Sequence, residues 1–323
     1  MDEANVAIIV VTPQTGRLLD RCLASIARQT IGPREVVVVL NGCGGADELA
    51  AAWSGKLPLK IVDLDENMGF AAVHPMALEH ISSKWIALLN ADAVAESDWL
   101  SECMEVGESS DDIGAVACAV LKATYSSRFE SLGMEVGASG AAYLSRWDEF
   151  YMEYAPLDVF GAAGAAAMYR RETIDRVGFF DPWFFAYYED VDLAWRIRAA
   201  GYRTVAASRA RVHHIGGAFA SSAASSYYYM QRNRLAVIIT NWPASAILRN
   251  FMKIAVVDAA SILFSIVEHG PMAAVRARLS ILGNLPKLLS MRRRRTKNAE
   301  VRVDKWMVDD REKAMKRLRW KLS

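Results

Sequence analysis

The sequence contains few cysteines, and they follow no motif. Four occur in 323 residues, at Cys22, Cys43, Cys103 and Cys118. None has the close partner that a zinc site or a redox dithiol requires, and four are too few to crosslink a chain of this length. We therefore expect free thiols and a cytoplasmic protein.

A secretory signal is also missing from the start of the chain. Met1-Asp2-Glu3 is acidic, and the first apolar run, Val6 to Val11, has only six residues. A signal peptide would have a basic start and a longer apolar stretch, so export is not expected. Nucleic acid is not an expected partner either, because the sequence offers no platform of interleaved aromatic and basic residues.

Charge is unevenly distributed along the chain. The net charge is +1, but residues 291–323 carry thirteen Lys or Arg and five Asp or Glu, so this tail alone is +8. Hydrophobic residues make up 53% of the chain and charged residues 23%, which is enough apolar material for a large buried core. We expect one main domain over residues 1–240 and a basic, helical C-terminal appendage over residues 241–323.

The first 120 residues alternate short apolar runs with helical patterns. Apolar residues between 18 and 26 recur at helical spacing and predict an amphipathic helix. Repeated strand-helix-strand units predict an open α/β sheet whose ligand site lies beyond the carboxyl ends of its strands. Residues 122–160 suit loops and short antiparallel strands. The predicted buried strands are 6–11, 35–40, 59–64, 85–89 and 115–121.

A carboxylate and an amide follow directly after one predicted strand. Trp85 to Leu89 leads into Asn90 and Asp92, so both side chains emerge where the ligand crevice begins. A carboxylate at this place suits a divalent cation that stabilises the charge on a departing diphosphate. The equal alternative is that Asp92 caps the next turn, as Asp often does.

Three carboxylates stand together in the second half of the chain. Glu189, Asp190 and Asp192 follow an aromatic run, Phe184 to Tyr188, and precede a helical pattern. Helix capping and the helix dipole explain one or two of them. Three acids beside aromatic residues exceed what a cap needs, and crowded carboxylates raise one another's pKa, which suits a general base. We therefore favour a catalytic function for this acidic run.

Two further motifs are ambiguous. His213 and His214 precede Ile215-Gly216-Gly217, where a neutral imidazole could complete a metal shell or bind phosphate, although such pairs are more often structural. Gly161 to Gly164 indicates a close backbone approach, either to a ligand or to a tightly packed neighbouring element. Neither motif decides between its two interpretations by itself.

Together these segments resemble the family-two inverting glycosyltransferases of the GT-A fold, especially the bacterial branch that adds rhamnose, galactofuranose or similar sugars to surface polysaccharides. The resemblance covers residues 5–240, and its most specific stretch is 177–202, with Asp181 and the acidic run inside it. It implies a Rossmann-like mixed sheet flanked by helices, a nucleoside-diphosphate sugar donor, a glycan or lipid-linked acceptor, and Mg²⁺ or Mn²⁺ as cofactor.

The resemblance also implies roles for individual residues. Asp190 would be the catalytic base, and Asp192 or Glu189 would position the base or the acceptor. The metal ligands would be Asp92 and His214. The nucleotide-sugar site would comprise Thr12, Gln14, Asn41, Asn67, Gly69, Asn90, Arg232 and Arg234, and the acceptor site Gly161, Ala163, Gly164 and Tyr188.

Several positions differ from the family pattern. Leu40 stands where an aspartate commonly reads a uracil or thymine ring, which bears on the nucleotide that is bound. Pro13 and Gln14 replace an aromatic-Asn pair. Ala91 stands in place of a proline or a second acid, and His74 in place of an asparagine.

We expect an inverting hexosyltransferase that acts in the synthesis of cell-surface polysaccharide, by a single in-line displacement. The alternative is a catalytically silent glycosyltransferase-like subunit with a binding or scaffolding role, which the Leu40 difference motivates. A nucleotidyltransferase would need basic residues near its first glycine-rich loop, and residues 42–45 lack them. The oligomeric state stays open.

The tail has two interpretations. Ile247 to Val267 is apolar, but Lys253 and Asp258 interrupt it, and it falls short of a comfortable bilayer span of ~20 apolar residues. A basic segment and a final amphipathic helix would suit an anionic membrane surface at the inner face of the cell membrane, with a solvated helix or a partner's docking site as the alternative. The residues concerned are Arg292 to Arg295, Val308, Met315, Leu318 and Leu322.

Overall fold

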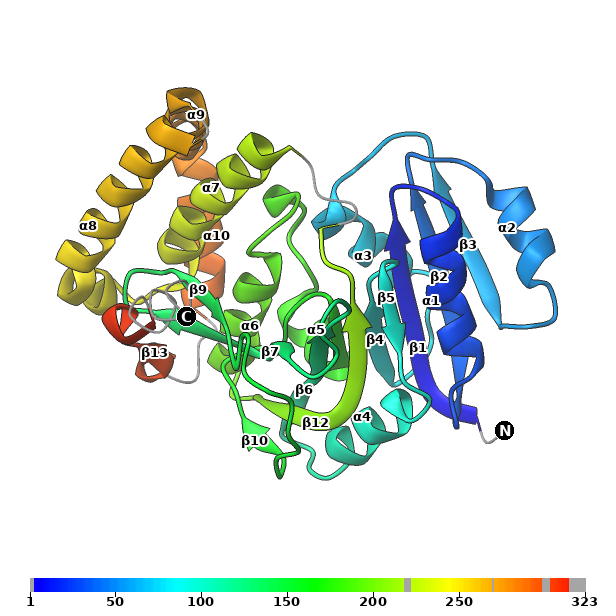
Figure 1. The fold of residues 1–323 in the computed structure, drawn as a ribbon. Coiled ribbons are helices and arrows are strands. Elements are labelled where there is room, and N and C mark those ends of the chain that lie inside the picture. The colour runs from blue at the N-terminus through cyan, green and yellow to red at the C-terminus, as the bar shows by residue number, and fades with distance from the viewer. Residues whose placement is uncertain (1–2, 218–221, 269, 298–302, 314–323) are drawn as a thin grey trace.

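The protein is a mixed β-sheet with helices on both faces, followed by a group of C-terminal helices. The computed structural model describes residues 3–217, 222–268, 270–297 and 303–313. The C-terminal helices lie at the end of the molecule away from the N-terminus (Figure 1). The mixed α/β fold class expected from the sequence is confirmed.

The main sheet has ten strands within the described residues. Its order is β10-β12-β6-β11-β4-β1-β2-β3, with β5 paired to β12 and β7 to β6. β3, β2, β1 and β4 are parallel, whereas β11 is antiparallel to both β4 and β6. The bounds are β1 Glu3–Thr12, β2 Gly32–Asn41, β3 Leu59–Leu64, β4 Trp85–Leu89, β5 Ala93–Ala95, β6 Ile113–Lys122, β7 Phe129–Leu132, β10 Leu157–Asp158, β11 Ala166–Arg170 and β12 Arg203–His214.

The central strands are apolar along their whole length because both faces of the sheet are covered. Successive residues of β1, such as Ile8 and Ile9, point into two different buried clusters. α1, α2 and α4 cover one face, while α3, α6 and α7 cover the other. The helices are α1 Arg17–Ala27, α2 Ala46–Trp53, α3 Phe70–Leu78, α4 Trp99–Gly107, α5 Arg171–Val177, α6 Glu189–Ala199, α7 Ala223–Asn241, α8 Ala244–Glu268, α9 Pro271–Gly283 and α10 Leu285–Lys297, with short 3₁₀ turns at Pro182–Phe184 and Asp304–Trp306.

The C-terminal segment returns to a small second sheet of β8 (Met134–Gly137), β9 (Ala142–Leu144) and β13 (Met307–Val308). β13 pairs in parallel with β8, and Asp310 accepts hydrogen bonds from Ser139 and Tyr143. The prediction of a final helix is therefore wrong at Val308, because this segment pairs with the open edge of β8 as a strand, but it is confirmed over residues 310–313, which are helical. Its other positions, 315, 318 and 322, lie outside the described residues.

The remaining local predictions agree well with the structure. All five predicted strands are confirmed, the helix over residues 18–26 is α1, and residues 122–160 form short strands and loops. The C-terminal helices share a hydrophobic core with the sheet, since Ala246, Ile281 and Leu288 belong to the same buried cluster as Ile9. The predicted boundary at 240/241 falls at the end of α7.

Candidate active site

Several predicted site residues lie at one edge of the main sheet. β1, β2 and β4 are parallel, so Thr12, Asn41 and Asn90 leave the sheet at the same end. In an open α/β sheet this is the end where ligands bind. The Asn90 N–H donates to the Ala165 carbonyl (3.0 Å), which brings the end of β4 beside the glycine-containing segment 161–164.

Two asparagines hold the loop after β3 against the end of β2. The Asn41 amide donates to Asn67 Oδ1 (3.1 Å), and Asn41 Oδ1 accepts from the Met68 N–H (2.8 Å). A Cβ on Gly42 would lie 2.6 Å from the Asn67 backbone nitrogen, so only glycine permits this approach. Asn41 and Asn67 thus shape the predicted nucleotide-sugar loop, and direct contact of either with a nucleotide stays a prediction.

Gly69 brings the same loop to the acidic run. Its φ is +83°, and a Cβ at this position would lie 2.4 Å from the Phe185 ring. The Ala71 N–H donates to the Phe185 carbonyl (2.9 Å). The predicted nucleotide-sugar loop is therefore in direct contact with the turn that precedes Glu189.

Thr12 and Gln14 form a tight turn after β1. The Thr12 hydroxyl donates to the Gln14 carbonyl, and the Gln14 N–H lies 3.3 Å from Thr12 Oγ1. Thr12 is buried and Gln14 is exposed, so of the two side chains only that of Gln14 has surface that a ligand could contact. The nearby Leu40 is fully buried in the core, where its side chain has no exposed surface for a base.

His214 joins two carboxylates at the end of β12. Its Nε2 lies 3.2 Å from Asp92 Oδ1 and 3.5 Å from Asn90 Nδ2, and its Nδ1 lies 3.0 Å from both oxygens of Glu130. Burial alone would lower the pKa of His214. The hydrogen bonds to Asp92 and Glu130 outweigh burial and raise this pKa to about 9.

His214 has the orientation that a metal ligand would need, and its role as a cation ligand stays a prediction. Glu130 engages Nδ1 of His214, which leaves Nε2 to face Asp92, as in the carboxylate-histidine-metal arrangement of protein metal sites. Within the part of the chain that the structure describes, no group of three or more His, Cys, Asp or Glu is placed to hold an ion. A cation here would take Asp92 and His214 from the protein and its other ligands from phosphate oxygens and water, as Mg²⁺ commonly does.

The chain enters α6 through a turn with unusual backbone angles. Phe185, Tyr187 and Tyr188 have φ values of 64°, 67° and 68°, a region that costs non-glycine residues about 1–3 kcal/mol each. The Asn233 amide of α7 donates to the carbonyls of residues 184, 186 and 187 (2.9, 2.8 and 2.6 Å). Arg232 donates to those of residues 183 and 184 (2.8 Å each). α7 therefore fixes the backbone from which the acidic run begins.

Asp190 is the half-buried member of the acidic run. Its Oδ2 accepts from the Gly164 N–H (3.1 Å), and its Oδ1 accepts from the Val191 N–H (2.8 Å). Burial raises the pKa of Asp190, although the backbone hydrogen bonds oppose the shift. A carboxylate with a raised pKa, oriented by backbone donors, has the properties of a general base.

Glu189 is buried more deeply than Asp190. Among the described residues its Oε2 has no hydrogen-bond partner. Burial first, and the neighbouring Asp190 second, raise the pKa of Glu189 well above its usual range. The pKa of Glu189 is raised further than that of Asp190, so within the pair a proton favours Glu189.

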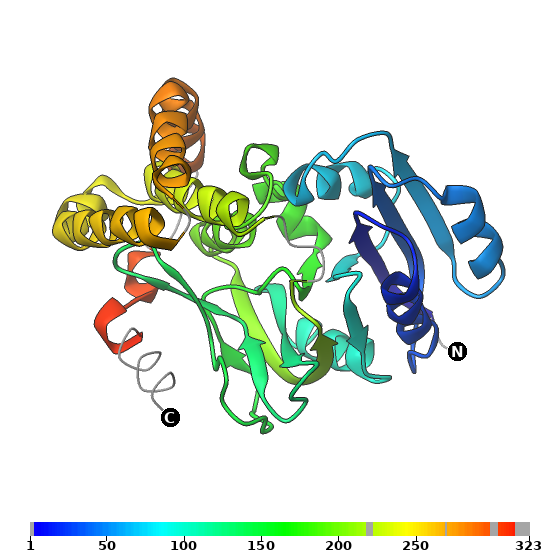
Figure 2. The same cartoon turned by 45° about the horizontal axis from the view of Figure 1, so that its top comes forward.

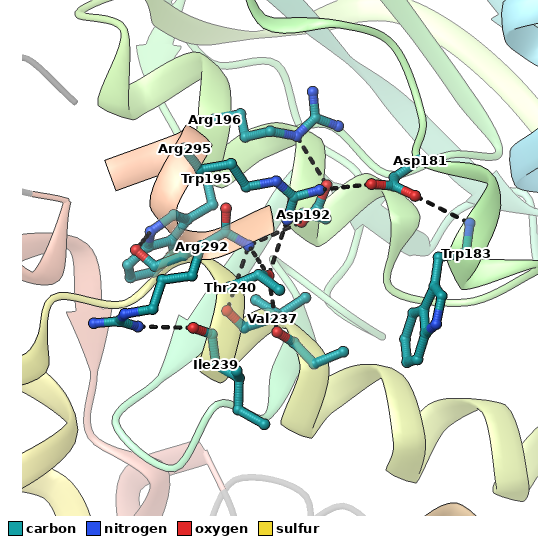
Figure 3. A network of polar contacts seen from close by, with 12 residues as sticks. Asp181, Trp183, Asp192, Trp195, Arg196, Val237, Ile239, Thr240, Arg292 and Arg295 are labelled. Carbon is teal, nitrogen blue, oxygen red and sulfur yellow. Dashed lines mark hydrogen bonds and ion pairs between the residues drawn. The ribbon is translucent and has the colours of Figure 1, made fainter. Parts of the chain in front are cut away.

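Asp192 is fully buried in a network of polar contacts with Arg196 and Arg295 (Figure 3). Its Oδ2 accepts from Arg196 Nε (2.8 Å), and its Oδ1 accepts from Asn241 (2.8 Å) and from Arg295 of α10 (2.5 Å). Burial alone would raise the pKa of Asp192, but Arg295 and Arg196 outweigh it and hold this pKa below its usual value. These contacts make Asp192 an anchor for α6, and a direct role in catalysis stays a prediction.

The two arginines predicted to face a diphosphate have protein partners. Arg232 stacks on Trp183, with its guanidinium carbon 4.2 Å from the ring centre. Arg234 donates to the Ser139 carbonyl (2.8 Å) and to Asp258 (2.7 Å). Both therefore hold α7 in place here, and their contact with a nucleotide stays a prediction.

The predicted acceptor residues have different surroundings. Gly164 donates to Asp190, so it lies at the proposed base. Ala163 is buried. The Tyr188 hydroxyl accepts from the Ala142 N–H (3.1 Å), which ties the start of α6 to β9. Contact of these residues with an acceptor stays a prediction.

Gly161 is required for packing beneath α6. A Cβ at this position would lie 2.3 Å from the Cβ of Ala194, which is backed by the helix. We expect Gly161→Ala to lower the free energy of unfolding by about 1–3 kcal/mol, as overpacking of a core does. The control is Gly32→Ala, where a Cβ would meet nothing within 4 Å. Equal midpoints for the two variants in urea unfolding would contradict the packing role.

The family model described as Glycosyltransferase like family 2 matches residues 4–236. The chain belongs to this family. The predicted resemblance to family two and the GT-A fold are thereby confirmed, whereas the branch that adds rhamnose or galactofuranose and the inverting mechanism stay predictions.

Family-2 relatives among curated proteins are distant and cover part of the chain. O-antigen biosynthesis protein RfbC of Myxococcus xanthus is 26% identical over 224 residues, which are 65% of this chain and 17% of RfbC. Amylovoran biosynthesis glycosyltransferase AmsE of Erwinia amylovora is 26% identical over 106 residues, which are 32% of this chain and 40% of AmsE. The chain thus matches less than half the length of each of these relatives.

Two solved structures share the fold of this family-2 chain. A mannosyltransferase of Pyrobaculum calidifontis, solved with GDP-Man and Mn²⁺, has a TM-score of 0.55 at 19% identity and covers 90% of this chain and 84% of its own. TarS 1-349 of S. aureus, solved with UDP-GlcNAc, has a TM-score of 0.58 at 16% identity, with 90% and 82% covered.

Proposed function

We propose that this chain is an inverting glycosyltransferase that moves a sugar from a nucleoside-diphosphate donor to a hydroxyl of a glycan or lipid-linked acceptor. One observation carries the proposal. Asn90, two residues before Asp92, bonds to Ala165 (3.0 Å), and the adjoining Gly164 bonds to Asp190 (3.1 Å). A diphosphate bound at Asp92 and an acceptor hydroxyl at Asp190 would therefore both lie beside the backbone of residues 164 and 165, close enough for transfer between them.

In the proposed reaction, Asp190 takes the proton of the acceptor hydroxyl. The oxygen attacks the anomeric carbon while the bond from that carbon to the phosphate oxygen breaks, the nucleoside diphosphate leaves, and the anomeric configuration inverts. Asp92 and His214 would hold Mg²⁺ or Mn²⁺, which would supply positive charge against the charge developing on the diphosphate. Because the pKa of Glu189 is raised further than that of Asp190, a proton on Glu189 would leave the negative charge of the pair on Asp190.

The similar proteins support the donor class and the setting. The neighbours solved with GDP-Man and with UDP-GlcNAc support a nucleotide-sugar donor, and the neighbour with Mn²⁺ supports the cation. The names of RfbC and AmsE refer to O-antigen and amylovoran biosynthesis, which supports a role in cell-surface polysaccharide synthesis. We infer a cytoplasmic enzyme that works at the inner face of the cell membrane.

A catalytically silent subunit is the second candidate, because the buried Leu40 offers no carboxylate to a base. Calorimetric titration of the purified chain with UDP, GDP and dTDP, with and without Mn²⁺, separates the two. The proposed enzyme binds at least one of them, and more tightly with Mn²⁺. A folded chain that binds none of them under either condition would favour the silent subunit.

The two adjacent histidines of β12 provide a matched test of the cation site. His214 faces Asp92, whereas His213 turns to Glu96 (2.9 Å), because successive strand residues point to opposite faces. We expect His214→Gln to weaken Mn²⁺ binding to the chain with nucleoside diphosphate by roughly 10–100-fold, as loss of a metal-site partner does. His213→Gln should leave it unchanged. Equal affinities in Mn²⁺ titrations followed by electron paramagnetic resonance would exclude His214 as a ligand.

The raised pKa of Asp190 predicts the acid side of the pH profile. A general base works only when ionised, so kcat/KM should fall as pH falls through the pKa of Asp190. Because burial raises this pKa, the fall should occur above the ordinary aspartate value of about 3.9. Initial rates over a pH series, with folding checked at each pH, give the midpoint. A midpoint at or below the ordinary value would argue against Asp190 as the base.

A further inference from the structure

The C-terminal helices carry a large apolar surface that the rest of the chain leaves exposed. α8 and α9 project from one end of the molecule, remote from β1–β3 (Figure 2). Most of the exposed apolar side chains of each helix recur at spacings of three, four or seven residues, which places them on one side of that helix; Phe251, Phe264 and Ile266 of α8 are exposed as well. The apolar face consists of Leu248, Met252, Val256, Leu263 and Val267 of α8 and Met272, Val275, Leu279 and Leu282 of α9.

This apolar face extends along nearly the whole of α8. The part on α8 alone runs from Leu248 to Val267, about 28 Å at the rise of an α-helix. Contiguous apolar patches of such extent on folded proteins mark interaction surfaces. We therefore expect the apolar face to bind a partner that buries its apolar side chains.

α8 is also anchored to the protein on its other side. Asp258, near the middle of the helix, accepts from Arg234 of α7 and Arg278 of α9 (2.7 Å each). By length and composition α8 is the one helix of the described residues that could cross a membrane, and 11% of its apolar window is buried. A crossing would separate Asp258 from both arginines, so α8 is suited to lie along a membrane and not to span it.

The charge around the apolar face selects the kind of partner. Residues 244–297 contain ten Lys or Arg and two Asp or Glu. One of the two acids, Asp258, is already paired with Arg234 and Arg278. A second copy of this chain would bring two such positive segments together, which like-charge repulsion opposes. The exposed cations are Arg249, Lys253, Arg276, Lys287, Arg293 and Arg294, of which Arg249 pairs with Asp304.

We propose that the apolar face of α8 and α9 docks onto an anionic lipid bilayer, with the helices in the plane of the interface. The apolar side chains enter the boundary between headgroups and acyl chains, while the exposed cations contact lipid phosphates, as in other interfacial amphipathic helices. Where the proposed reaction uses a lipid-linked acceptor, docking would hold the enzyme at the surface that carries it.

Co-sedimentation of the full chain with lipid vesicles tests this proposal without donor or acceptor, so its failure would leave the proposed reaction untouched. Vesicles of phosphatidylcholine alone are compared with vesicles that also contain phosphatidylglycerol. We expect a roughly tenfold or greater preference for the anionic vesicles at low salt, which high salt removes.

Two methionines provide matched variants for this test. Met252 on the apolar face is 69% exposed, and Met152 in an irregular segment elsewhere is 56% exposed, so neither substitution disturbs a core. Met252→Glu alone should lower vesicle binding, and combined with Leu279→Glu it should lower binding roughly tenfold or more, because charge then faces the acyl boundary. Met152→Glu should bind like the unsubstituted chain, and all variants should keep the same circular dichroism spectrum.

Several outcomes would overturn the proposal. The folded chain would stay in the supernatant with anionic vesicles, or Met152→Glu would reduce binding as much as the paired substitution. A dimer in light scattering that Met252→Glu dissociates would assign the face to a second copy. Retention of the chain in vesicles through alkaline carbonate extraction would assign α8 as a spanning helix.

Discussion

Asp190→Asn is expected to lower the turnover of sugar transfer by roughly 10²–10⁴-fold, which is the contribution of a positioned general base. The amide keeps the shape of the side chain and can still accept the Gly164 N–H, which now lies 3.1 Å from Asp190 Oδ2. Donor binding should therefore change little. Initial rates and calorimetric donor titrations on the same preparation measure the two quantities separately.

Asp175→Asn is the control for this substitution. Asp175 lies on α5, its side chain is more than half exposed, and it pairs with Arg171 (2.8 Å). The same chemical change there should leave both turnover and donor affinity as they are. Near-normal turnover in Asp190→Asn, or equal losses in the two variants, would remove Asp190 from the role of base.

Arg295→Ala is expected to lower the free energy of unfolding by about 2–3 kcal/mol. Arg295 donates to Asp192 (2.5 Å), Thr240 (2.9 Å) and Asp181 (3.0 Å), so it links α10 to both ends of the segment that carries the acidic run. Removing one partner of a buried ion pair leaves a charge without compensation, which costs about 3–5 kcal/mol. We expect a smaller loss than this, about 2–3 kcal/mol, because Arg196 still pairs with Asp192 when Arg295 is removed.

The same helix supplies the control for Arg295. Arg293 is exposed, and Arg293→Ala should change the free energy of unfolding by less than about 0.5 kcal/mol, as most surface substitutions do. A double-mutant cycle with Asp192→Asn should also show that the losses from Arg295→Ala and Asp192→Asn do not add. Equal unfolding curves for the two arginine variants would show that α10 does not stabilise α6.

The sheet could be predicted from the sequence because its physical signal is local. A strand buried on both faces must be apolar throughout, so runs such as 6–11 and 85–89 stand out without knowledge of their neighbours. The ends of those strands then indicate where Asn41, Asn90 and Asp92 emerge. The crowding of Glu189 and Asp190 is likewise visible in the sequence, and the structure shows burial raising the pKa of both.

The partners of these residues could not be predicted because they come from distant segments. Glu130 reaches His214 across 84 residues from a short strand without a distinctive pattern. Arg232 was predicted to contact the nucleotide sugar, and only the fold shows that Arg232 and its neighbour Asn233 hold the turn before Glu189. The spacing of residues along the sequence does not indicate which distant carbonyl oxygen a side chain will bind.

The C-terminal tail shows a second limit to predicting structure from sequence. Amphipathic spacing of apolar and basic residues predicted a helix through Val308, but an unpaired strand edge outweighs helical periodicity when it can supply backbone hydrogen bonds. The apolar run after Ile247 was predicted to be short for a membrane span, whereas α8 has 25 residues. Its exposure and its Asp258 contacts, which set its orientation, depend on tertiary structure.

The anomeric configuration of the product tests the central claim most directly. A panel of nucleotide sugars is incubated with the chain, Mn²⁺ and a hydroxyl acceptor, and the new glycoside is analysed by nuclear magnetic resonance. A single displacement with Asp190 as base predicts a configuration opposite to that of the donor. A product that retains the donor's configuration, or a folded chain that neither binds nor consumes any nucleotide sugar, would contradict the account.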